Sequence, residues 1–200
     1  MNARREIPHR SFTDAGPVGA AGRARAIVAG LAVVALVGGT GCGPAAEAVP
    51  GCGSLRRLAV VAQAVPTASY VPCLDDLEEG WTAEGFDVRR GRAEFRLEPG
   101  RAGGRAVEVV LSGRCDVVGA VPTRPRAEGV RTSIRLASIA PRYAGTLADA
   151  FPGGCVTYRF DFRRGPHIPL MEELQSAVAL LSRQQLRLEL RRELDVELDP

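Results

Sequence analysis

The sequence contains no lysine: all 26 basic residues among its 200 are arginine, and Asn2 is the only asparagine. A GC-rich genome, which avoids the codons AAA and AAT, accounts for this usage. Because Asn2 lies at the start of the chain, residues 49–200 contain no N-x-S/T acceptor for N-glycosylation.

Residues 49–200 also lack the common motifs of hydrolytic enzymes. GxSxG, HExxH and SxxK are absent from this part of the sequence, and its only histidine is His167, in the segment GPHIPL. The acidic cluster 75–79, which contains Asp75, Asp76, Glu78 and Glu79, resembles a solvated turn more than a pair of catalytic carboxylates. We therefore assign no catalytic residue, and a cell-envelope hydrolase that uses His167 or the Asp75–Glu79 cluster remains the alternative.

A strong charge of one sign is missing as well. Residues 1–48 contain 5 of the 26 arginines and 3 of the 23 acidic residues. Residues 49–200 therefore contain 21 arginines and 20 acidic residues. A nearly neutral folded part argues against a nucleic-acid partner. The sequence has no CxxC pair for zinc and no phosphate-binding loop with its lysine, so we expect neither a metal site nor a cofactor.

The long apolar run of the chain is Ala26–Gly43, which follows Arg23 and Arg25. The uncharged stretch continues to Glu47, and as a helix its 21 residues would be about 31 Å long, enough for the hydrocarbon core of a membrane. Arginines before the run and none for some distance after it are typical of an exported segment whose N-terminal side stays inside the cell. We predict a basic tail or n-region in 1–25, a signal or single transmembrane helix in 26–43 and a linker in 44–53.

Three fates of this segment remain open. Ala46-Glu47-Ala48 is a possible signal-peptide cleavage site that would release a chain starting at Val49. Gly39-Thr40-Gly41-Cys42 resembles a lipoprotein lipobox, with Cys42 as the lipid-bearing residue, although Gly39 stands where an aliphatic residue is usual. Without cleavage the segment would be a membrane anchor. We favour a membrane-tethered protein whose folded part, residues 54–200, is extracytoplasmic.

Four cysteines remain in the folded part: Cys52, Cys73, Cys115 and Cys155. In an oxidising compartment an even set of this size indicates two disulfides, for which three connectivities are possible. Sequential pairing, Cys52 with Cys73 and Cys115 with Cys155, is the simplest of them.

Apolar periodicity predicts an α+β fold. Helical spacing in 55–65 indicates an N-terminal helix that ends at Pro66. Alternation of apolar and polar residues indicates strands separated by Gly and Pro turns, and Cys155–Phe162 is predicted to be central. The other alternating stretches are 86–88, 93–97, 105–111 and 130–139. We expect an antiparallel sheet or small sandwich with one N-terminal helix and one or two C-terminal helices, stapled by disulfides.

The C-terminal part returns to helical spacing. Pro169 suits the first turn of a helix, and Leu170, Leu174, Val178 and Leu181 form an apolar stripe at intervals of four, four and three. Residues 186–198 are compatible with a strand or a helix, and their Arg, Glu and Leu content favours the helix.

Three segments carry a resemblance to known proteins: GCGSLRRLAVVAQ from Gly51, VPCL from Val71 and FPGGCVTYRFDF from Phe151. They resemble stretches of uncharacterised exported and membrane-anchored proteins of high-GC Gram-positive bacteria. The resemblance implies a membrane-associated domain and carries over no activity. Together these features predict a non-catalytic binding role at the cell envelope, with the membrane bound through residues 26–43 and an envelope protein or ligand as the partner.

Overall fold

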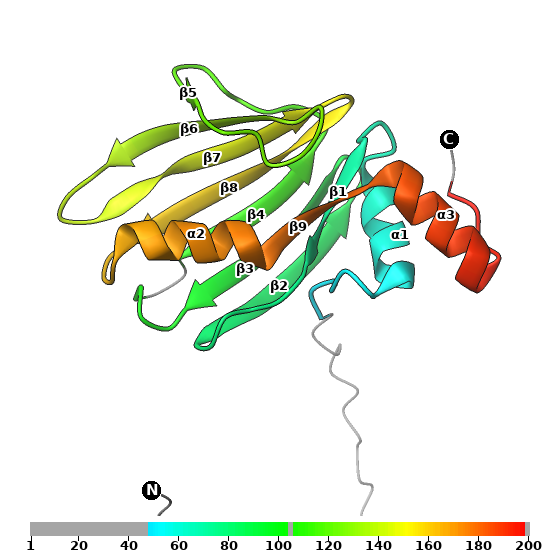
Figure 1. Cartoon of the computed structure of the whole chain (residues 1–200), viewed down its shortest axis with the longest axis horizontal. Helices are drawn as coiled ribbons and strands as arrows, with labels where there is room; N and C mark the ends of the chain where they lie inside the picture. The colour runs from blue at the N-terminus through cyan, green and yellow to red at the C-terminus, as the bar shows by residue number, and fades with distance from the viewer. Residues whose placement is uncertain (1–47, 104–105, 199–200) are drawn as a thin grey trace, which may run out of the picture. The chain divides into compact units, whose positions relative to one another are not determined.

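In the computed structural model, which describes residues 48–103 and 106–198, one seven-stranded sheet and one two-stranded ribbon form the β-structure. All strand pairs of both are antiparallel, and the order in the large sheet is β2-β3-β4-β8-β7-β6-β5 (Figure 1). Its strands are β2 Trp81–Arg89, β3 Arg92–Pro99, β4 Val107–Ser112, β5 Val121–Pro122, β6 Arg131–Ser138, β7 Tyr143–Phe151 and β8 Gly154–Phe162. The predicted α+β class with an antiparallel sheet is confirmed, and the predicted central strand is β8.

The ribbon and the helices complete the chain. The ribbon pairs β1 Tyr70–Leu74 with β9 Val178–Ser182, and the helices are α1 Leu55–Ala64, α2 His167–Ala177 and α3 Arg183–Leu194. Among the described residues none of these helices is long and apolar enough to cross a membrane. The predicted membrane segment 26–43, Cys42 and the basic tail 1–25 lie outside the residues that the structure describes.

One face of the large sheet forms the core. The strand register aligns Phe95, Val109, Tyr158 and Leu147 across β3, β4, β8 and β7. Leu170 and Leu174 of α2 belong to the same buried cluster, and Figure 1 shows α2 and the ribbon in front of this sheet. The opposite face carries charged residues such as Glu108 and Arg159, whose side chains are 3.0 Å apart. Helix α2 and the ribbon therefore cover one side of the sheet, whereas the other side is partly exposed, as is usual for antiparallel sheets.

The helix α1 forms because its apolar residues repeat at helical spacing. Leu55, Leu58, Val61 and Ala62 are buried, which confirms the predicted N-terminal helix. The buried Arg183, the first residue of α3, donates through Nη1 to the carbonyl of Ala62 at 2.8 Å and so joins the two helices.

The C-terminal part differs from the predicted continuous stripe. The helix α2 ends at Ala177, and residues 178–182 form β9, in which Val178 pairs with Leu74 and Leu181 with Val71. The prediction of one helix through Leu181, made from the apolar spacing, is therefore wrong. Pairing with β1 overrides the local helical preference of residues 178–182. The helix favoured for residues 186–198 is confirmed for residues 186–194, which belong to α3, whereas residues 195–198 lie beyond its end.

Both edges of the large sheet are protected against pairing with further strands. The edge strand β2 has a register shift between Glu84 and Asp87, and the opposite edge strand β5 has only two residues, of which Pro122 has no N–H group. Bulges, short strands and proline are the usual devices that prevent edge-to-edge association.

Two disulfides with the predicted sequential pairing are present. Cys52 is bonded to Cys73 with a Cα–Cα distance of 4.9 Å, and Cys115 to Cys155 with a Cα–Cα distance of 5.8 Å. The first attaches the segment before α1 to β1, and hydrogen bonds from Cys52 N to Leu74 O and from Leu74 N to Pro50 O continue this attachment.

Candidate functional site

The two catalytic candidates of the sequence lie at different places around α2. His167 is the first residue of α2, and its ring stacks on Tyr143 with 5.1 Å between centroids. The backbone N–H of Asp75 donates to the carbonyl of Ala177, the last residue of this helix. Ten residues of α-helix span about 15 Å, so His167 and Asp75 are at opposite ends of α2. Asp76, Glu78 and Glu79 are exposed to solvent, as in a solvated turn.

Residues 113–130 connect β4 to β6 and contain the two-residue strand β5; we call this segment the β4–β6 loop. Near its start the disulfide Cys115–Cys155 attaches it to the central strand β8. A cross-link between residues 40 apart stabilises a fold by about 4 kcal/mol in the loop-entropy model. Arg135 of β6 adds a hydrogen bond from Nη1 to the carbonyl of Val118 at 2.8 Å.

The far end of the β4–β6 loop is held by the side chain of Arg126. Its Nη1 donates to Asp149 Oδ2 at 2.8 Å and to the Tyr158 hydroxyl oxygen at 2.6 Å, and the guanidinium lies over the Tyr158 ring. Its Nη2 donates to the carbonyls of Gln175 and Val178 at the C-terminal end of α2. One guanidinium therefore joins the loop, strands β7 and β8 and the end of a helix, where a cation is favourable.

Burial makes these contacts strong. The Asp149 side chain is 0% exposed and that of Arg126 is 12% exposed. The second carboxylate oxygen of Asp149 accepts a hydrogen bond of 2.7 Å from the Thr132 hydroxyl, so both oxygens have partners. Burial lowers the pKa of Arg126, but Tyr158 and Asp149 raise it by more, and the pKa of the guanidinium lies above its usual value. We name Arg126, Asp149, Thr132 and Tyr158 the Arg126 network.

Burial also raises the pKa of Tyr158 well above its usual value; the charge of Arg126 opposes the shift and that of Asp149 adds to it. Because the pKa is higher in the folded state, the contribution of Tyr158 to stability is complete below its unfolded pKa of about 10 and is lost as the pH rises above that value. We expect the free energy of unfolding to fall from about pH 10 upwards, and the fall to be smaller in Tyr158→Phe. Urea unfolding at increasing pH measures this, and the same pH dependence in both proteins would contradict it.

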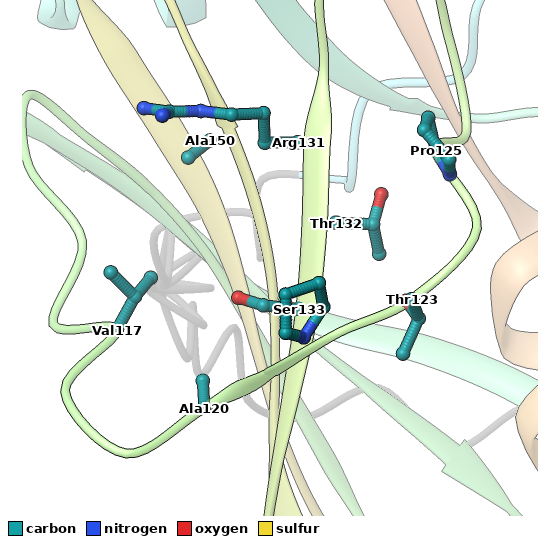
Figure 2. A pocket seen from close by; sticks show the side chains of 9 residues that line it. Val117, Ala120, Thr123, Pro125, Arg131, Thr132, Ser133 and Ala150 are labelled. Carbon is teal, nitrogen blue, oxygen red and sulfur yellow. The ribbon is translucent and has the colours of Figure 1, made fainter.

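A pocket of about 390 Å³ lies beneath the β4–β6 loop. Figure 2 shows side chains of the loop and of β6 around it, with Arg131 and Thr132 on opposite sides of the β6 ribbon. Its lining residues are Val117, Ala120, Pro122, Thr123, Pro125, Arg131, Thr132, Ser133 and Ala150. We call this cavity the loop pocket.

The chemistry of the loop pocket is that of a binding site. Five of its nine residues are Val, Ala or Pro, and the others offer hydroxyl groups and one guanidinium. These nine residues include no histidine, cysteine or carboxylate, so the lining supplies neither a general base nor a strong nucleophile. An apolar lining with a few polar groups suits an apolar group that needs orientation by hydrogen bonds.

No family model, curated protein or solved structure matches the chain. The site therefore has to be interpreted from its own geometry. Within the described ranges, His, Cys, Asp and Glu side chains form no group of three or more that could hold a metal ion.

A second cavity, of about 320 Å³, lies on the other side of the same loop segment, between α2 and strands β6 and β7. Ile134, Tyr143 and Leu147 contribute from the strands and Ile168 and Met171 from α2, while Thr123 lines both cavities. Neither cavity could be predicted from the sequence, because residues 113–130 have no apolar periodicity and no known binding motif. No sequence pattern distinguishes Arg126 from the neighbouring arginines.

Proposed function

We propose that this chain is a membrane-tethered, extracytoplasmic domain that binds a partner at the cell envelope without catalysing a reaction, and that the loop pocket receives the partner. The observation that carries the proposal is the construction of this site. A loop fixed at one end by Cys115–Cys155 and at the other by Arg126 encloses a mainly apolar cavity. Binding sites are commonly formed by loops that a rigid scaffold positions.

Two features support the cellular location. The uncharged run after Arg25 has the length and the flanking charges of an exported membrane segment. Two disulfides favour an oxidising compartment, because the cytoplasm keeps most thiols reduced.

The tether is tested by the intact mass of protein recovered from the membrane fraction, with and without reduction and alkylation. We expect a chain that is uncleaved or that starts at a diacylated Cys42, with four cysteines that react only after reduction. A soluble chain starting at Val49, or four cysteines that react before reduction, would contradict this part of the proposal.

The binding site is tested with a photo-crosslinking amino acid at Val117, which lines the loop pocket and is 42% exposed. The matched control places the same amino acid at Leu188 on α3, another exposed aliphatic position. In intact cells we expect a crosslinked product from position 117 that is absent from position 188. Ala150→Leu, which narrows the pocket from β7, should abolish that product. The same products from both positions, or no effect of Ala150→Leu, would argue against the loop pocket as the binding site.

A further inference from the structure

Large apolar side chains are exposed along one edge of the molecule. Among the described residues nine large apolar side chains are exposed, and five of them lie between residues 117 and 139. Val118 is 79% exposed and Ile139 is 68% exposed, and the others are Val117, Val121 and Leu136. Several exposed apolar side chains in one region of a protein commonly mark an interaction surface.

These side chains follow strand β6 in order. Val121 pairs with Ile134, the carbonyl of Val118 accepts from Arg135, and Leu136 and Ile139 lie farther along the same strand and in the turn after it. From Ile134 to Ile139 an extended chain covers about 17 Å. In Figure 1 this edge runs from β5 along β6 to the β6–β7 turn at the left. We call the exposed residues of segment 114–143 the β6 edge surface.

The same segment carries a positive charge that the rest of the domain lacks. Residues 114–143 contain six arginines and two acidic residues, a net charge of +4, whereas residues 49–200 as a whole have a net charge of +1. The remainder of the folded part is therefore negative by three charges. Arg126 is buried against Asp149, so the exposed residues of the segment carry a net +3, although Asp161 of β8 lies 3.3 Å from Arg142 and offsets one of these charges. The exposed arginines are Arg114, Arg124, Arg131, Arg135 and Arg142.

Pairing with a further β-strand does not explain this surface. The strand β5 covers β6 at Ser133 and Ile134, and Pro122 removes an N–H group from the outer edge of β5. An added strand would find few backbone partners beside β5, and the part of β6 beyond it, Arg135–Ser138, is only four residues long. The occupant must instead complement exposed Val, Leu and Ile side chains together with several arginines.

We propose that the β6 edge surface, which shares Val117 and Arg131 with the lining of the loop pocket, docks on an anionic lipid bilayer in addition to the tether. Exposed aliphatic side chains in turns enter the boundary between headgroups and acyl chains, and arginines beside them bind anionic headgroups. An acidic protein would satisfy the charges, but aliphatic side chains as exposed as Val118 and Ile139, in turns at both ends of the surface, suit insertion into a fluid interface. The domain would thus lie against the membrane in one orientation, with the outer opening of the loop pocket near the lipid.

The test uses the full chain reconstituted in vesicles of phosphatidylcholine with brominated acyl chains, with or without phosphatidylglycerol. Bromine quenches a tryptophan only where the indole reaches the acyl chains. The reporters are Ile139→Trp and, at the other end of the surface, Val118→Trp; Leu188→Trp on α3 is the control, since Leu188 is 61% exposed. The native Trp81 is buried and is the only tryptophan of the chain, so it gives the same background in every variant.

We expect both reporters to be quenched in vesicles with phosphatidylglycerol, and the Leu188→Trp chain to show only the background of Trp81. Replacing Arg124 and Arg142 by glutamine should lower the association constant for these vesicles about fivefold for each arginine. The control variant, Arg56→Gln combined with Arg192→Gln, should leave this constant unchanged. Equal quenching at positions 139 and 188, or quenching of the reporters that does not depend on lipid charge, would overturn the proposal. Quenching of neither reporter in either kind of vesicle would also overturn it.

Discussion

Replacing Arg126 by methionine is expected to lower the free energy of unfolding by about 3–5 kcal/mol. Without the guanidinium the Asp149 carboxylate, 0% exposed, keeps only the Thr132 hydroxyl as a side-chain donor. The carbonyls of Gln175 and Val178 lose the same guanidinium. A buried charge without its counterion is among the most costly defects in a protein, and for a domain of this size the midpoint of thermal unfolding should fall by roughly 6–20 °C.

Two further variants make this prediction specific. Arg124→Met removes an arginine two residues away that is exposed, so it should change stability by no more than about 0.5 kcal/mol. Arg126→Met combined with Asp149→Leu removes both charges, and it should recover much of the loss, since an apolar pair can replace a buried ion pair. Urea unfolding of the four proteins measures these differences. A double variant no more stable than Arg126→Met, or equal losses at positions 124 and 126, would contradict the assigned role.

The importance of Arg126 could not be found in the sequence, although much of the fold could. Strands with clear alternation, such as β8 with Val156, Tyr158 and Phe160 on one face, were predicted because packing against the core selects apolar residues at every second position. The helix α1 was predicted for the same reason at a spacing of 3.6. An arginine in a proline-containing loop has no such periodic signal, and its partners come from β7, β8 and α2.

Strand β7 is an element of the large sheet that could not be predicted from the sequence. The segment YAGTLADAF contains alanine, glycine and aspartate, which are all depleted in strands, and no strand was predicted there. Tertiary contacts explain two of these residues. Asp149 is the counterion of Arg126, and a Cβ atom at Gly145 would lie 2.9 Å from the Phe160 ring and 2.4 Å from the carbonyl oxygen of Arg135. The strand is thus specified by what it touches rather than by its own propensity.

The disulfides could be predicted from the sequence, whereas the loop pocket could not. An even number of cysteines restricted the pairing to three possibilities, of which the sequential one is present. Since Cys115–Cys155 attaches the β4–β6 loop to the central strand, the sequence did contain one of the two anchors of the candidate site. The pocket between these anchors depends on the path of the loop across β6, which no local pattern encodes.

Replacing Gly153 by alanine is the second substitution with a large expected effect. Gly153 lies in the turn between β7 and β8 with φ of +74°, and a Cβ atom there would be 1.7 Å from the backbone oxygen of Thr67. The same turn is bound to the segment between α1 and β1: the Thr67 hydroxyl donates to Gly153 O at 2.6 Å, and Ser69 N donates to Pro152 O at 3.1 Å. A side chain at position 153 therefore requires the turn and this segment to separate.

Gly80→Ala is the matched control for this substitution. Gly80 has a similar φ of +84°, but a Cβ atom there would meet nothing within 4 Å. Gly80→Ala should therefore cost only the conformational strain of about 1–2 kcal/mol, whereas Gly153→Ala should cost about 4 kcal/mol or more. The difference between the two variants in urea unfolding measures the contact of the β7–β8 turn with Thr67. If both variants lost the same stability, the turn would be free to move, and the attachment of the central hairpin to the α1–β1 segment would not contribute to the fold.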